Sequence, residues 1–156
     1  MGACEYDGSS FSGFQVQKNA QSVQGSLEKA IASVGRLTNT INYSGRTDAG
    51  VHSLGQVFDF ESVDDRTLEQ WLRGINSALP DSISVTSLQE APENFHSRFD
   101  AIKRTYAYII YTGSTRPIFL KDYVFWEKNN LDIDLMESES NFLLGTHNFS
   151  SFRGSK

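Results

Sequence analysis

The sequence is poor in cysteine and histidine, with one Cys and three His in 156 residues. The single thiol of Cys4 cannot form an intrachain disulfide. The histidines His52, His96 and His147 do not form a pair with the spacing that zinc ligands show. We therefore expect no disulfide framework and no metal.

Long apolar runs are also absent. The longest, residues 106–111, is far shorter than the roughly 20 residues that a membrane helix needs. The N-terminus has no charged leader followed by a hydrophobic stretch, and Tyr6 stands where a myristoylation motif requires Ser or Thr. These absences predict a cytoplasmic protein without a membrane partner.

The chain has fewer basic than acidic residues, and its formal net charge is −5. An acidic balance argues against nucleic acid as a partner, because phosphate binders usually carry a basic surface. Residues 122–139, however, hold six acids against one lysine, so the rest of the chain is neutral overall. A local basic face is compatible with this distribution, and its candidates are His96, Arg98, Lys103 and Arg104, opposed by Asp100.

Two segments show the periodicity of amphipathic helices. Residues 22–35 carry apolar side chains on one helical face, with Ser22 as N-cap and Gly35 as the stop. Residues 65–79 repeat the pattern, and Pro80 ends it.

At 156 residues, with 38% of them hydrophobic, the chain has the length and composition of an ordinary globular domain.

Four short segments have the β-branched and aromatic composition of strands: one just before Tyr6, then 39–43, 56–60 and 83–88. With the two helices they predict the order β-α-β-β-α-β over residues 1–100. This is an α+β unit of ferredoxin-like type, with both helices on one face of an antiparallel sheet. The loop from Arg46 to Ser53 then joins the two middle strands.

Residues 101–156 look like the start of a second α/β unit that is not completed. Residues 104–111 alternate in the manner of a strand, and residues 123–126 give another short β-like run. Asp132 is expected to cap a helix that ends at Gly145. We expect this second unit to be truncated.

The middle loop is the part of the sequence that says most about function. Asp48 lies between Arg46 and His52, and Gly45, Gly50 and Gly55 are spaced along the same stretch. Glycines allow left-handed turns and a close approach by another backbone or a ligand. Taken alone, D-A-G is also an ordinary hairpin turn, but a loop between rigid strands is where functional groups are commonly placed.

Four motifs carry a resemblance that covers the whole chain. They are Y-D-G-S-S-F-S-G-F-Q at 6–15, G-R-T-D-A-G-V-H at 45–52, F-H-S-R-F-D-A at 95–101 followed by R-T-Y-A-Y at 104–108, and L-L-G-T-H-N-F-S-S-F-R at 143–153. In this order and spacing they closely resemble the tRNA pseudouridine synthase A family. The sequence departs from it at Phe14, where the family usually has Trp, and at Ser53, directly after the second motif, where a smaller residue is usual.

The resemblance implies an activity and a set of residue roles. The family isomerises uridine to pseudouridine in the anticodon stem-loop of tRNA, without cofactor or metal. Asp48 matches its catalytic aspartate. Arg46 matches the arginine that takes the place of the flipped nucleotide and salt-bridges to the active site, and Tyr106 the tyrosine that stacks on the uracil. We expect further RNA contacts from His52, Arg98, Lys103 and Arg104.

The resemblance also implies that a C-terminal half, which lines the other side of the uracil pocket, is missing. A second copy of the chain or a complementing partner would have to supply that wall. The alternative is a catalytically incomplete fragment that keeps the fold and weak RNA binding. A third hypothesis is an acid/base hydrolase that uses Asp48 and His52, and Tyr106 can also be read as a cross-strand packing residue.

Overall fold

The computed structural model describes residues 1–152, which fall into two compact units, one of residues 1–107 and one that begins at residue 108. The last residue of the fourth motif, Arg153, lies outside the described residues.

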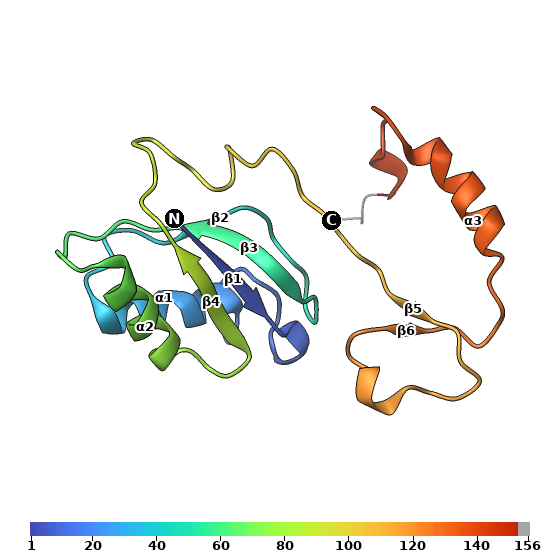
Figure 1. The fold of residues 1–156 in the computed structure, drawn as a ribbon, viewed down its shortest axis with the longest axis horizontal. Helices are drawn as coiled ribbons and strands as arrows, with labels where there is room; N and C mark the ends of the chain where they lie inside the picture. Colours follow the sequence, from blue (N-terminus) through green and yellow to red (C-terminus); the bar gives the residue numbers. More distant parts are fainter. Residues whose placement is uncertain (153–156) are drawn as a thin grey trace. The chain divides into compact units, whose positions relative to one another are not determined.

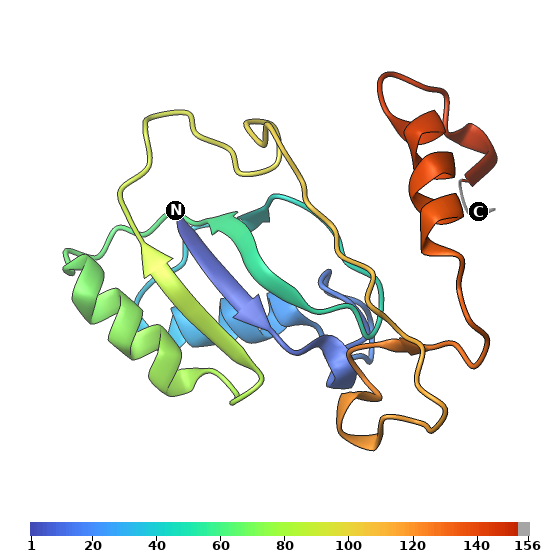
Figure 2. The same cartoon turned by 45° about the vertical axis from the view of Figure 1, so that its right-hand side comes forward.

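The first unit is a four-stranded antiparallel sheet with two helices on one face (Figures 1 and 2). The chain order is β1-α1-β2-β3-α2-β4, and the strand order in the sheet is β2-β3-β1-β4. The predicted α+β fold of ferredoxin-like type is therefore confirmed. The elements are β1 (Gly2–Tyr6), α1 (Val23–Val34), β2 (Asn42–Tyr43), β3 (Ser53–Asp59), α2 (Leu68–Ala78) and β4 (Ile83–Leu88).

Both helices begin at side-chain caps. Ser22 Oγ accepts the N–H of Gly25 at the start of α1, and Gly35 caps its end, as predicted. Helix α2 begins three residues later than predicted, because Thr67 and Gln70 form a capping box in which each side chain accepts the other residue's backbone N–H.

The strands between the helices differ from the predicted ranges. Strand β2 has two residues instead of five, since the N–H of Ile41 donates to Glu28 on α1 and not to a neighbouring strand. Strand β3 begins at Ser53, earlier than predicted, because its pairing with β1 extends through an irregularity to the Tyr6–Ser53 pair. The two strands that hold the middle loop are thus unequal in length.

The core lies between the sheet and the helices. Its fully buried side chains include Phe14, Leu27, Ile31, Phe58 and Ile75. The ring of Phe14 lies 4.5 Å from that of Tyr43 and 5.9 Å from that of Tyr6, centroid to centroid. Phe14, the position where the motif departs from Trp, therefore anchors the first motif in the core.

Burial also determines the state of the single thiol. Cys4 is fully buried on β1, and desolvation raises the pKa of its thiol to about 12. The thiol is therefore protonated at neutral pH and serves as a packing group.

The second unit contains a parallel pair of short strands, β5 (Ile110–Tyr111) and β6 (Phe125–Trp126), followed by α3 (Ile133–Ser140). Asp132 caps α3 as predicted, by accepting the N–H of Leu135. The helix ends at Ser140, before Gly145, and a 3-10 turn over Asn141–Leu143 follows it. None of residues 108–152 is buried.

The predicted strand over residues 104–111 is wrong except for its last two residues. Alternation of side chains favours a strand, but a strand forms only where a neighbour completes the hydrogen-bond ladder. Residues 104–108 have no such neighbour in the described part of the chain, and only the Ile109 carbonyl accepts a backbone bond, from Phe125 N–H at 2.8 Å. Among residues 1–152, no helix combines the length and apolar character of a membrane-spanning segment.

Candidate functional site

Asp48 lies on the loop between β2 and β3, and its side chain is exposed. The loop turns back on itself directly after it. Val51 N–H donates to the Asp48 carbonyl at 3.2 Å, and Gly50 takes a left-handed φ of 78°. A carboxylate in this position is open to a ligand and contributes nothing to the core.

The first motif forms a support beneath this loop. Phe14 N–H donates to the Thr47 carbonyl at 3.0 Å, and Gly50 N–H donates to the Phe11 carbonyl at 3.3 Å. The Tyr6 and Thr47 hydroxyls are hydrogen-bonded at 2.9 Å. Thr47 is therefore held through both its main chain and its side chain, immediately before Asp48.

Two glycines of the first motif allow this close contact. A Cβ on Gly13, whose φ is 92°, would lie 2.7 Å from the Thr47 carbonyl oxygen, and a Cβ on Gly8 would overlap the Val51 carbonyl. By its composition alone, this motif could be only a Gly- and Ser-rich turn. A motif that combines two glycines with a large aromatic residue was the signal that it packs against another segment.

His52 joins the loop to the first motif from the other end. Its Nδ1 accepts the Gly8 N–H at 3.1 Å and lies 3.2 Å from the Asp7 carboxylate. The imidazole is thus engaged in holding the loop, and nothing in its geometry favours a hydrolase in which His52 acts with Asp48.

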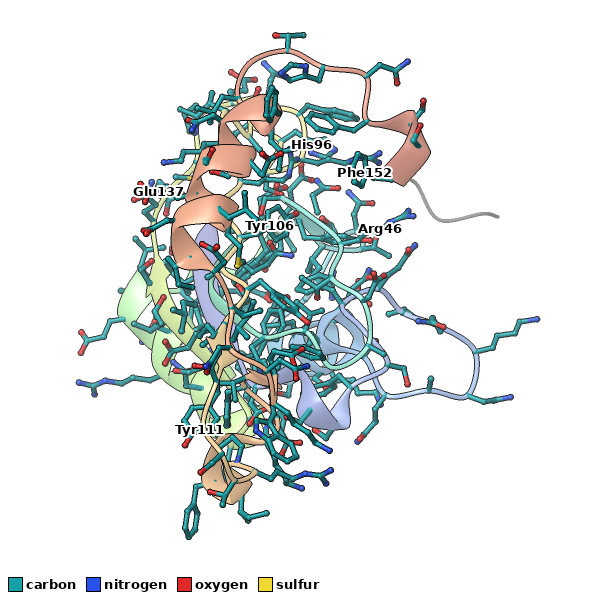
Figure 3. The ribbon with its side chains drawn as sticks, turned by 90° about the vertical axis from the view of Figure 1, so that its right-hand side faces the viewer. Arg46, His96, Tyr106, Tyr111, Glu137 and Phe152 are labelled. Carbon is teal, nitrogen blue, oxygen red and sulfur yellow. The ribbon has the colours of Figure 1, made fainter. Side chains whose placement is uncertain are left out.

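A pocket of about 520 Å³ lies beside the loop, within the first unit. Its lining consists of Gln15, Gln24 on α1, residues 40–46, and the group His96, Arg98, Arg104 and Tyr106. Figure 3 labels Arg46, His96 and Tyr106. No acidic residue of the described chain lines the pocket. Three guanidinium groups beside an exposed aromatic ring suit an anionic ligand with a planar group.

The pocket brings together four of the predicted site residues: Arg46, Arg98, Arg104 and Tyr106. The lining does not include Asp48, His52 or Lys103.

Asp48 and Arg46 are both exposed. Within residues 1–152 no ion pair joins them, so the salt bridge that the resemblance implies is not formed with Asp48 in this structure. Tyr106 lies near the start of the loop, since it lines the same pocket as Gly45 and Arg46.

A buried carboxylate on β3 places the segment that carries His96 and Arg98. Asp59 accepts the Ser97 N–H at 2.7 Å and the Asn42 side-chain amide at 2.8 Å. Burial by itself would raise the pKa of Asp59, but these hydrogen bonds and the nearby His96 lower it below its ordinary value. Sequence reasoning missed this residue, because nothing local distinguishes it from other strand carboxylates.

The lowered pKa of Asp59 predicts a dependence of stability on pH. A carboxyl whose folded pKa lies below its unfolded value of about 4 stabilises the fold above that pH. The stabilisation is lost as the pH falls through the folded pKa. We expect Asp59→Asn to lower the free energy of unfolding at neutral pH by about 1–3 kcal/mol and to flatten its decline in acid. Urea unfolding at a series of pH values measures both.

Asp65→Asn is the matched control, since Asp65 is exposed just before α2. It should leave both the stability and its pH profile close to those of the unsubstituted chain. An Asp59→Asn profile that declines in acid as steeply as the unsubstituted one would contradict the assignment.

Comparison with known proteins gives a consistent result. The family model described as tRNA pseudouridine synthase matches residues 3–100. "tRNA pseudouridine synthase A" of Francisella tularensis subsp. mediasiatica (strain FSC147) is 43% identical over 152 residues, which cover 97% of this chain and 59% of the relative. The protein of the same name from Legionella pneumophila (strain Lens) is 42% identical, over 96% of this chain and 57% of the relative.

The chain therefore spans a little under three fifths of the length of these curated relatives. The matched region contains residues 3–100 of the first unit, with the Asp48 loop, its support and all the residues that line the pocket except Arg104 and Tyr106. This chain belongs to the tRNA pseudouridine synthase family.

Proposed function

We propose that the chain isomerises uridine to pseudouridine in the anticodon stem-loop of tRNA, in the cytoplasm, with Asp48 as the essential carboxylate. The observation that carries the proposal is the exposed Asp48, held on a braced loop beside a pocket of three arginines and Tyr106. In this reaction the C1′–N1 bond breaks, the base rotates, and C1′ bonds to C5. The C5 proton is lost and N1 gains one, so no redox cofactor is required.

A single carboxylate meets the needs of this reaction, as a nucleophile or as a proton acceptor and donor. No group leaves the site, and the product has the same atoms as the substrate. The remaining requirement is access, because the uracil must leave its stack before Asp48 can reach the ribose.

The energy balance of base flipping assigns different roles to the pocket residues. Extruding a base costs a few kcal/mol, and stacking it on an aromatic side chain returns about 1–3 kcal/mol. Tyr106, which is 75% exposed, has a ring available for this contact. Stacking alone therefore only offsets the cost of extruding the base. We assign the remaining binding free energy to phosphate contacts from Arg46 and Arg98.

This assignment predicts RNA binding that weakens with salt. The slope of log affinity against log salt should be about −0.7 for each phosphate contacted on single-stranded RNA. Arg98→Ala should reduce the slope by about one such contact, and Arg66→Ala, an exposed arginine outside the pocket, should not change it. Fluorescence anisotropy with a labelled anticodon stem-loop measures the slope. Affinity that does not change with salt would contradict the proposed basic face.

The proposed activity is tested by mapping pseudouridine in bulk tRNA after incubation with the chain. The relatives are longer, so the reaction is run with the chain alone, which can supply a second wall by dimerisation, and with the remaining segment of a relative added as a separate polypeptide. We expect pseudouridine in the anticodon arm in at least one of these reactions. If no reaction yields it, the alternative of a catalytically incomplete fragment is favoured.

A further inference from the structure

Arg104 is hydrogen-bonded to the backbones of two other segments of the pocket wall. Its Nε and Nη2 donate to the Ser44 carbonyl at 2.8 and 2.5 Å, and Nη2 also donates to the Arg98 carbonyl at 3.3 Å. A guanidinium whose donors point at carbonyl groups has fewer donors left for a phosphate. Arg104 is therefore less suited to a phosphate contact than its charge and its place in the sequence indicate.

The three segments that Arg104 joins carry the candidate site. Ser44 lies two residues before Arg46, at the start of the Asp48 loop, and Arg104 lies two residues before Tyr106. Residues 101–109 form no strand or helix, so no ladder holds the backbone of Tyr106 in the described part of the chain. The guanidinium fork supplies a connection that a strand ladder would otherwise provide.

The start of the loop is also held by β3. Gln56, which is buried on β3, donates to the Gly45 carbonyl and accepts the Ser44 hydroxyl at 2.8 Å. Ser44 N–H donates to the Val57 carbonyl at 2.9 Å. With its N–H and hydroxyl bonded to β3, Ser44 offers Arg104 a fixed carbonyl, so the contact can position the arginine's own segment.

We propose that Arg104 is a positioning residue that holds Tyr106 against the loop of Arg46 and Asp48, and that it does not bind RNA phosphate. The proposal rests on the proposed function for its effect on rate, but its structural part does not. Lysine keeps the charge of Arg104 but has a single nitrogen, and it cannot reproduce a planar fork onto two carbonyls. The substitution Arg104→Lys therefore separates positioning from charge.

In the kinetic arm, pseudouridine formation is followed under single turnover at saturating stem-loop RNA, in whichever reaction mixture is active. Arg104→Lys is expected to lower the rate by about 10- to 100-fold, because misplacement of about 1 Å has effects of this size. In Arg104→Ala, which removes the charge, the Kd should stay within about 3-fold of the unsubstituted value and the salt slope should not change, since the loss of a phosphate contact would alter both. Arg66→Lys is the matched control and should change none of these.

Two kinetic results would overturn the proposal. One is an Arg104→Lys protein that retains the full rate at saturation. The other is an Arg104→Ala protein whose salt slope falls by about one phosphate contact.

The structural arm needs no activity. In a ¹⁵N-labelled chain, Arg104→Lys is expected to shift or broaden the amide signals of Gly45, Arg46 and Tyr106, and to leave those of β4 in place. Arg66→Lys should disturb none of them. Unchanged signals at all three positions would overturn the proposal. If the unsubstituted chain and its mixtures form no pseudouridine, the proposed function fails and these amides still decide the role of Arg104.

Discussion

Asp48→Asn is expected to lower the rate of pseudouridine formation by about a thousand-fold or more, because an amide is neither a nucleophile nor a base at neutral pH. The side chain is exposed and takes part in no ion pair of the described chain, so asparagine fits the same space without loss of packing. The free energy of unfolding should change by less than about 0.5 kcal/mol. Single-turnover assays on stem-loop RNA and urea unfolding measure the two quantities.

The two measurements together separate chemistry from folding. Asp48→Ala, run in parallel, guards against slow deamidation of the asparagine back to aspartate. Asp65→Asn provides an exposed carboxylate outside the site and should keep the full rate. An Asp48→Asn protein that retains full activity would remove the carboxylate from the mechanism.

Gly13→Ala is expected to have the largest effect among the glycines of the site. Its φ of 92° is unfavourable for any residue with a side chain, and the new Cβ would lie 2.7 Å from the Thr47 carbonyl oxygen. Left-handed strain and overpacking each cost about 1–3 kcal/mol. We therefore expect the free energy of unfolding to fall by about 2–4 kcal/mol, measured by urea unfolding, with a displaced Asp48 loop and a reduced rate.

Two other glycines provide a matched series. Gly50 also has a positive φ, of 78°, but a Cβ there meets nothing within 4 Å, so Gly50→Ala tests strain alone and should cost about 1–2 kcal/mol. Gly55 lies on β3 with open space around it and no positive φ, so Gly55→Ala should be neutral or slightly stabilising. Equal effects at all three positions would show that the contact between Gly13 and Thr47 has no energetic role.

Local chemistry explains which elements were predictable. Helix α1 follows from Ser22, Gly35 and the apolar stripe between them, and all of these interactions lie within a few residues of one another. Strand β4 has the predicted range because its β-branched residues pair with a central strand. Residues 104–108 have an equally good alternating pattern but no neighbouring strand in the described chain, and the pattern alone did not make a strand.

The candidate site shows the same difference between local signals and contacts that join distant segments. Asp48, Arg46 and Tyr106 could be proposed from the sequence, because their motifs carry the family resemblance and their side-chain types suit the chemistry. The long-range contacts that hold the walls of the pocket could not. Asp59 reaches Ser97 across 38 residues, and Arg104 reaches Ser44 across 60.

The sequence by itself determined the caps that begin α1 and α3, the order of the elements and the place of Asp48 on a loop between two strands, since these depend on neighbours within a turn or on residue chemistry. Only the tertiary structure decided which residues support Asp48 and which line the pocket beside it. Such contacts depend on how the β2–β3 pair meets segments far along the chain. A buried carboxylate or a guanidinium fork finds its partners only after those segments have come together.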